Sequence, residues 1–135
     1  MNDFKSFLKD AEIILEEAEE SLRKEHYHRV VRKSQESAEL AVKGFLSYLG
    51  IEYPRVHILG AVLRRRLREL VKKEDLEKLC FYYDSLAFER IPSFYGSPDG
   101  IPASELYTRE DAEDALKKSQ WIVRFVKSSM ERSEK

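Results

Sequence analysis

The residues of this sequence best suited to chemistry are clustered arginines. Between Arg55 and Lys73 the chain has seven basic residues and one acidic residue, a net charge of +6, whereas the whole chain carries −1. Guanidinium groups bind phosphate oxygens through paired hydrogen bonds, so such a cluster predicts salt-dependent binding of a nucleotide or of RNA. A solvated helix face whose arginines pair with acidic neighbours would have the same composition. Both interpretations stay open on the sequence.

The three histidines are candidates for metal binding or proton transfer. Glu25 and His28 have the Glu-x-x-His spacing of di-metal bundles, but that architecture needs a second copy, and His57 has Pro54 at the corresponding position. His26 and His28 would project from different sides of a helix, so they would not converge on one ion. We therefore predict no metal site and no cofactor. His28 and His57 remain weak candidates for a general acid or base.

Other catalytic patterns are absent from the sequence. It contains no glycine-rich phosphate loop and no Gly-x-Ser-x-Gly nucleophile turn. The single cysteine, Cys80, lies between two apolar residues, where we expect a buried and unreactive thiol. Enzymatic activity is left open, and the sequence favours a binding protein over an enzyme.

Apolar residues recur every three or four positions, which is the spacing of amphipathic helices. The pattern predicts helices over residues 3–23, from about 25 to 49, from about 57 to 70, from about 74 to 88 and from about 109 to 131. Gly50 is expected to end the second helix in a left-handed conformation, and Thr108 with Asp111 to cap the last. Long helices with short early connections favour an all-α, antiparallel up-and-down bundle of four to five helices, in one domain over residues 1–135.

The longest predicted connection, residues 90–107, contains three of the four prolines and two of the five glycines. Connections of this length are uncommon in a small domain and are often functional. Phe94 and Tyr95 lie within it, and further aromatic residues lie nearby in the sequence. Such rings could stack on a nucleobase, although anchoring the core and the loop is their commoner use.

The composition narrows the classes of partner. With 24 basic and 25 acidic residues, the chain has no uniform attraction to nucleic acid or to a membrane, so such binding needs a local patch. No apolar stretch approaches the roughly 18 residues needed to span a bilayer, and the first residues do not resemble a secretion signal. We therefore expect a cytoplasmic protein without a membrane partner. The single asparagine and two glutamines among many charged residues suggest, as a hypothesis, a thermophilic source.

The run from Ser34 to Leu46, closed by Gly50 and followed by Pro54 to Leu59, resembles the signature of HEPN domains, the higher eukaryote and prokaryote nucleotide-binding domains. Arg90-Ile-Pro is similar to the Arg-Tyr-Pro segment of that family, and Thr108 to Ala112 is similar to the start of its last helix. The resemblance covers essentially the whole chain. It implies an up-and-down helical bundle, commonly a homodimer, often encoded beside a minimal nucleotidyltransferase and acting with it as a toxin and antitoxin pair.

The sequence also departs from that family. Many members are metal-independent endoribonucleases that carry an arginine and, four to six residues later, a histidine, in a helix at a dimer cleft. Here no histidine follows His57, so the usual place of the motif is empty. Arg23 and His28 have the spacing but lie at the junction of the first two predicted helices, and we interpret the match as a coincidence. The tyrosine that a partner enzyme nucleotidylates in some members is replaced by Val30.

The favoured hypothesis is a homodimeric HEPN protein that binds a nucleotide or RNA phosphate and pairs with a nucleotidyltransferase. Arg55 and His57 would open the third helix, whose unpaired backbone amides also favour an anion. The residues predicted to bind phosphate are Lys43, Arg55, His57, Arg64, Arg65 and Arg90. Two alternatives stay open: an endoribonuclease in which His28 or His57 transfers a proton, and a non-catalytic adaptor that uses its arginines for protein contacts.

Overall fold

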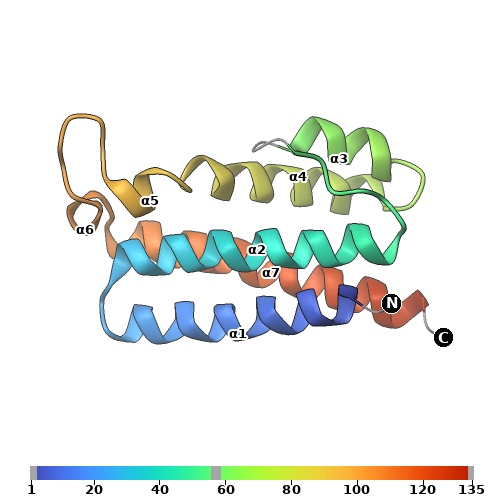
Figure 1. Ribbon diagram of the computed structural model, residues 1–135, viewed down its shortest axis with the longest axis horizontal. Coiled ribbons are helices and arrows are strands. Elements are labelled where there is room, and N and C mark those ends of the chain that lie inside the picture. The colour runs from blue at the N-terminus through green and yellow to red at the C-terminus, as the bar shows by residue number, and fades with distance from the viewer. Residues whose placement is uncertain (1–2, 56–58, 134–135) are drawn as a thin grey trace.

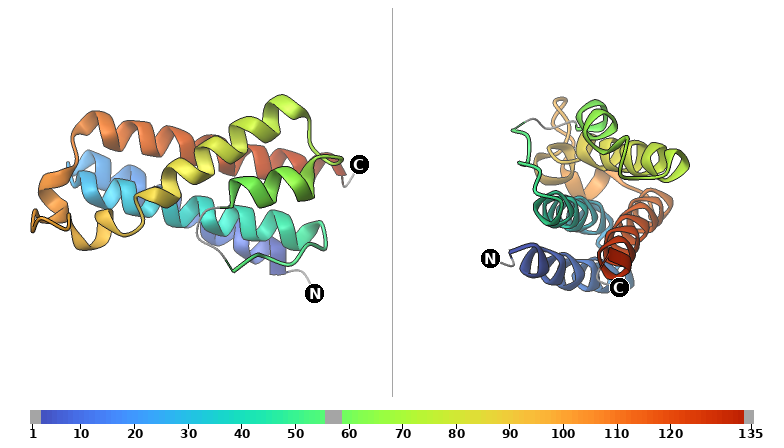
Figure 2. Two further views of the ribbon diagram at one scale, coloured as in Figure 1. Left: turned by 90° about the horizontal axis from the view of Figure 1, so that it is seen from above. Right: turned by 90° about the vertical axis from the view of Figure 1, so that its right-hand side faces the viewer.

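The computed structural model describes residues 3–55 and 59–133, which are helical and contain no strand. The long helices are α1 (Asp3–Arg23), α2 (Tyr27–Tyr48), α4 (Lys73–Phe88) and α7 (Arg109–Ser133). The short helices are α3 (Gly60–Leu67), α5 (Pro92–Tyr95) and α6 (Ala103–Leu106). Successive long helices run in opposite directions, and α2 and α7 lie between α1 on one side and α4 on the other (Figures 1 and 2). The predicted all-α antiparallel bundle is therefore confirmed.

The core forms because each long helix buries one apolar face. Val42 of α2, Leu79 of α4 and Val126 of α7 are completely buried in the same cluster. Small residues allow α1 and α2 to approach closely, as their positions along α2 predict. A Cβ atom on Gly44 would lie only 3.0 Å from the carbonyl oxygen of Phe4. No helix of the described residues is both long enough and apolar enough to cross a membrane.

Two predicted helix ends, the end of α2 and the start of α7, are confirmed in detail. Gly50 has a φ of +73°, and the amide of Ile51 donates to the carbonyl of Leu46 at 2.8 Å, which closes α2 in a Schellman motif. At the start of α7, the Thr108 amide donates to Asp111 at 2.9 Å, and the Asp111 amide donates to the Thr108 hydroxyl at 3.2 Å. These reciprocal bonds form the expected capping box.

The third helix is shorter than predicted at its carboxyl end. It ends at Leu67, and Leu70, which we expected to bury within it, is 59% exposed. The chain reverses there to enter α4, with an extended backbone at Lys72 (ψ 142°), so the apolar face cannot continue. The predicted start at His57 falls outside the described residues.

The long connection between α4 and α7 is ordered by its own hydrogen bonds and by two single-turn helices. The Ser97 amide donates to the Ile101 carbonyl at 2.9 Å, and the Ile101 amide donates to the Ser97 hydroxyl at 3.1 Å. Gly96 is required at this turn, because its φ is +88° and a Cβ would collide with the Ile101 carbonyl. This arrangement leaves Phe94 and Tyr95 on the surface, with 48% and 75% of their area exposed.

Candidate functional site

Side chains from three segments converge on a groove between α2 and the carboxyl end of α4. The groove has a volume of about 340 Å³. We call it the α2–α4 groove, and its lining residues are Gln35, Glu39, Lys43, Tyr53, Pro54, Arg55, Ala87 and Arg90. Three of the residues predicted to bind phosphate, Lys43, Arg55 and Arg90, therefore lie together.

The path of the chain explains why these residues meet. After α2, the connection to α3 turns back along the bundle instead of extending beyond its end (Figure 1). The Tyr53 hydroxyl fastens this connection to α4, since it lies 2.6 Å from the hydroxyl of the buried Tyr83. The Gly60 amide donates to Asp84 at 2.9 Å and forms a second tether to the same helix. Arg55 lies two residues after the first tether and lines the groove together with residues of α2.

The groove has an excess of positive charge. Three cationic side chains and one carboxylate line it, a net of +2. Lys43 is half-buried, with its ammonium 3.4 Å from Glu39 and 5.1 Å from the centre of the Tyr53 ring. Glu39 also accepts a hydrogen bond from the buried Gln35 amide at 3.0 Å. These contacts fix the lysine before any ligand binds, which lowers the entropic cost of binding an anion.

Tyr53, which lines the groove, and its buried partner Tyr83 remain protonated at neutral pH. Burial raises the pKa of Tyr53, although the hydrogen bond with Tyr83 and the charge of Arg90 partly oppose the rise. Burial, with the charge and hydrogen bond of Tyr53, raises the pKa of Tyr83 far above its usual value. Both phenols therefore act as hydrogen-bonding and packing groups and not as nucleophiles or bases.

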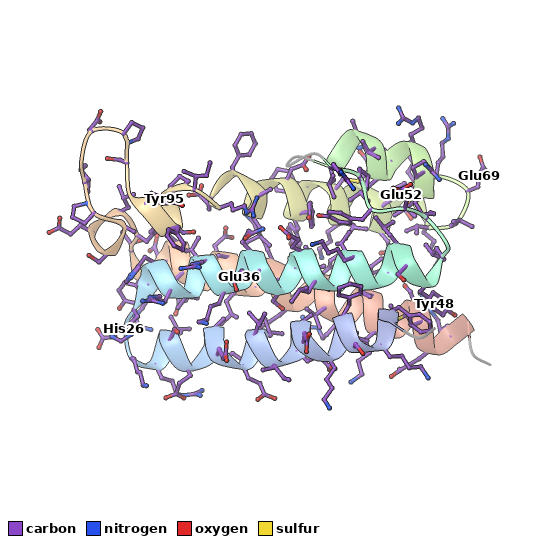
Figure 3. All side chains as sticks on the ribbon, viewed as in Figure 1. His26, Glu36, Tyr48, Glu52, Glu69 and Tyr95 are labelled. Carbon is purple, nitrogen blue, oxygen red and sulfur yellow. The ribbon has the colours of Figure 1, made fainter. Side chains whose placement is uncertain are left out.

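A second hollow of about 530 Å³ adjoins the groove. We call it the aromatic hollow, and it is lined by Arg32, Gln35, Glu36, Glu39, Arg90, Ile91, Phe94 and Tyr95. It shares Gln35, Glu39 and Arg90 with the α2–α4 groove, so the two form one continuous depression. Figure 3 labels Glu36 on α2 and Tyr95 on α5, which belong to its two walls.

Sequence reasoning selected Lys43 of α2 but missed the other residues of this helix that line the depression. Arg32, Gln35, Glu39 and Lys43 are three or four residues apart, which places them on one face of the helix. That spacing is present in the sequence, but the apolar residues of α2 have the same spacing and were the only ones used to predict the helix. The adjacent buried positions of α2 face the core, and this polar stripe borders the groove.

Arg64 and Arg65 do not reach the groove. They line a separate hollow of about 560 Å³ beside α3, which we call the α3 basic surface: Ala61, Arg64, Arg65, Arg68, Lys73, Leu76 and Glu77. Its lining has no residue in common with the α2–α4 groove. The Arg64 guanidinium is paired with Glu77, Nε to Oε2 at 2.7 Å.

The start of α3 differs from the predicted anion site. The amide of Gly60, the first residue of the helix, donates to the carboxylate of Asp84. A side chain of the protein itself therefore occupies the position predicted for a ligand anion at this amide. His57, the other residue predicted there, lies outside the described residues.

His28 lines neither the groove nor the adjoining hollow. It belongs to the first turn of α2, about 10 Å along the helix axis from Gln35, the nearest residue of this helix that lines the groove, at about 1.5 Å per residue. Burial lowers the pKa of His28, and the charges of Arg29 and His26 lower it further. Arg23, which has the family spacing to His28, donates from Nε to Glu20 at 3.0 Å. In the described part of the chain, no three His, Cys, Asp or Glu side chains are grouped as metal ligands would be.

Comparison with known proteins bears on the fold and the family. A protein of Methanocaldococcus jannaschii named "Putative toxin MJ1304" is 35% identical over 131 residues, which cover 91% of this chain and 85% of that protein. The crystal structure of TT1696 from Thermus thermophilus has a TM-score of 0.81 at 28% identity, over 96% of this chain and 99% of that one.

A second solved structure carries the family name. ST0689, described as an archaeal HEPN homologue, has a TM-score of 0.71 at 31% identity, over 95% of this chain and 98% of that one. Residues 4–129 match the HEPN domain family. This match covers nearly the whole chain and agrees with the helical bundle described above. The chain belongs to the HEPN domain family.

Proposed function

We propose that this HEPN protein binds the phosphate groups of a nucleotide or of RNA in the α2–α4 groove, and that it is the toxin-like member of a pair with a minimal nucleotidyltransferase. The observation that supports binding most directly is the convergence of Lys43, Arg55 and Arg90 from three separate segments. Cations gathered from distant parts of a sequence need the fold to bring them together, unlike neighbours on one exposed helix.

The groove offers phosphate two kinds of partner. Arg55 and Arg90 present planar guanidinium groups that match two phosphate oxygens at once, and Lys43 supplies a point charge. Glu39 holds Lys43 in place and partly neutralises the site. The remaining charge of +2 complements the charge of a phosphate diester or monoester.

The test is an equilibrium titration of ATP and of a short single-stranded oligoribonucleotide against wild type and Arg55→Gln. We expect Arg55→Gln to weaken binding of both ligands by about tenfold, as expected for one charged hydrogen-bonding group. Arg124→Gln is the matched control, because Arg124 is exposed on α7 and lines neither hollow. Equal affinities in the three proteins would contradict the proposal.

The toxin-like role rests on the relative named as a toxin and on family membership. The partner is tested by co-expressing the chain with the product of the adjacent reading frame, if that frame encodes a short protein with the Gly-Ser and paired aspartates of nucleotidyltransferases. Stable co-purification and relief of growth inhibition are expected. A toxic chain whose effect the neighbour does not relieve would contradict the pairing.

The proposal includes a homodimer, which an apolar surface on α4 supports. Phe81 and Phe88 lie two turns apart on one face of this helix and are 64% and 65% exposed. Exposed apolar patches of this kind commonly mark protein interfaces. Sedimentation equilibrium should give a dimer for the wild type and a monomer for Phe88→Glu, with Glu110→Gln as a surface control. A monomeric wild type would contradict this part of the proposal.

The endoribonuclease alternative gains no support from the described residues. His28 lines neither the α2–α4 groove nor the aromatic hollow, so no contact places it against a phosphate held in the groove. Cleavage of RNA that persists in chelator and vanishes in His28→Ala or His57→Ala would restore that alternative. An adaptor would show affinity for neither ATP nor RNA.

A further inference from the structure

The aromatic hollow has a wall suited to the flat face of a ring. The Phe94 and Tyr95 ring centres are 4.5 Å apart, and the Arg32 guanidinium lies 3.9 Å from the centre of the Phe94 ring. Tyr95 is 75% exposed although α5 is ordered by backbone hydrogen bonds. The two ring planes are tilted by 49° and Arg32 covers the Phe94 ring, so the exposed Tyr95 ring is the surface on which a nucleobase can stack.

The opposite wall carries groups that read the edge of a base. Glu36 accepts from Arg32 Nε at 3.0 Å through one of its two oxygens, and Glu39 accepts from Gln35. A carboxylate accepts hydrogen bonds and cannot donate them when ionised. The carboxylates therefore favour a ring edge that carries an amino donor, which guanine and adenine have and uracil lacks.

The hollow also lies next to the groove, where the base of a nucleotide whose phosphates occupy the groove would extend. It shares Gln35, Glu39 and Arg90 with the α2–α4 groove, so a phosphate bound there has its sugar and base directed along one continuous depression. The volume of about 530 Å³ accommodates a purine and its ribose within the usual range of ligand pockets.

We propose that the aromatic hollow binds the base of an amino-bearing purine nucleotide, stacked on Tyr95 beside Phe94 and Arg32, with its amino group directed to Glu36. The inference rests on the proposed function, because the phosphates of the same nucleotide lie in the α2–α4 groove. It adds a preference among bases, which phosphate binding alone does not give. The same chemistry is available in a free nucleotide and at one end of a single-stranded RNA.

The experiment compares ligands that differ only in the base. Tripolyphosphate, GTP, ATP, ITP and UTP are titrated against the wild-type protein by calorimetry. ITP lacks the 2-amino group of GTP and is otherwise the same. We expect GTP and ATP to bind about tenfold more tightly than tripolyphosphate and UTP, with ITP weaker than GTP. Oligoribonucleotides that end in guanosine or in uridine then distinguish an RNA terminus from a free nucleotide.

Two variants separate stacking from edge recognition. Tyr95→Ala should lower the affinity for GTP about tenfold, to that of tripolyphosphate, and should leave tripolyphosphate binding unchanged. Glu36→Gln should abolish the preference for GTP over ITP. Leu70→Ala is the control for loss of an exposed apolar side chain, because Leu70 is 59% exposed and does not line the hollow. Circular dichroism and sedimentation of each variant check the fold and the oligomeric state.

The outcomes distinguish this inference from the proposed function. Equal affinity for all five ligands, with all binding lost in Lys43→Met, would overturn the base site and leave the phosphate groove intact. No binding of tripolyphosphate or nucleotide would overturn both. A Tyr95→Ala protein that keeps its preference for GTP but changes oligomeric state would assign the aromatic wall to a protein interface and overturn the base site.

Discussion

The two cationic regions of this protein differ in how they are built. In the α3 basic surface, Arg64, Arg65 and Arg68 are near neighbours on and just after one short helix. In the α2–α4 groove, cations come from a helix, a connection and the residues after another helix. The first region is the strongest charge signal in the sequence, yet the second has the more specific geometry. A dense run of like charges guarantees proximity along the chain, but it does not make the side chains point at one ligand.

The surroundings of the charges differ as well. Lys43 is half-buried between Glu39 and the Tyr53 ring, which restricts its position. Arg64 and its partner Glu77 have side chains that are 46% and 52% exposed, so solvent and salt weaken their interaction. The groove is therefore suited to directed hydrogen bonds, and the α3 basic surface is suited to general attraction of a long polyanion.

The largest expected difference between the regions concerns a mononucleotide. Lys43→Met with Arg90→Gln should lower the affinity for ATP at least about 100-fold, because two charged hydrogen-bonding groups are lost. Arg64→Gln with Arg65→Gln removes the same charge and should change that affinity less than about twofold. Calorimetric titration of the two double variants gives the comparison. Similar losses in both would show that net charge, and not the groove, controls binding.

A second prediction concerns a substitution that loosens the groove but removes no cation. Gly60→Ala should lower the free energy of unfolding by about 1–2 kcal/mol, because the new Cβ collides with Asp84 and breaks the tether to α4. The affinity for ATP should fall severalfold, since Arg55 is then less firmly held.

Urea denaturation and calorimetry measure the two effects of Gly60→Ala. Gly100→Ala is the control, because Gly100 also lies on the surface and a Cβ there meets no atom within 4 Å, although its φ of +92° costs about 1 kcal/mol for alanine. Equal effects on ATP affinity in the two variants would contradict a role for the Gly60 tether.

A third, smaller effect concerns long RNA. Arg64→Gln with Arg65→Gln should weaken binding of an oligoribonucleotide by about threefold and reduce the slope of log affinity against log salt by up to about 1.4, or about 0.7 for each lost phosphate contact. The measurement is fluorescence anisotropy at several salt concentrations. An unchanged slope would show that the α3 basic surface does not bind RNA. A large loss of ATP affinity in this double variant would contradict the separation of the α3 basic surface from the groove.

The smallest effect concerns alkaline pH. The pKa values of Tyr53 and Tyr83 are raised in the folded protein, so above about pH 10 the unfolded chain loses these protons first. The contribution of these two tyrosines to stability should therefore be constant up to about pH 10 and fall as the pH rises further. Tyr83→Phe should lose about 1 kcal/mol at pH 7 with the hydrogen bond and show a shallower alkaline decline. A decline as steep as that of the wild type would assign the effect to other groups.

The bundle was predictable because its signals are local. Apolar spacing located the four long helices, Gly50 marked the end of α2, and Thr108 with Asp111 marked the start of α7. The early end of α3 was not predictable, because Leu70 has the correct spacing but the chain must turn there to reach α4.

The candidate site was predictable only in part. Lys43, Arg55 and Arg90 were selected by residue type and by the family resemblance, and the fold brings them together. Arg64 and Arg65 were grouped with them because they lie close in sequence to Arg55. Their separation depends on the connection that turns back along α2, which is held by contacts to α4 between residues 24 or more positions apart. No local pattern encodes such contacts.

The two tethers couple the position of α4 to the geometry of the groove. Arg90 directly follows this helix, and Arg55 is fastened to it through Tyr53 and Gly60. Lys43, in contrast, belongs to α2. Two of the three cations are therefore connected to α4, and the third belongs to α2. A shift of α4 relative to α2 would change the distances between these cations. By linkage, a ligand bound to all three cations would oppose such a shift to the same extent.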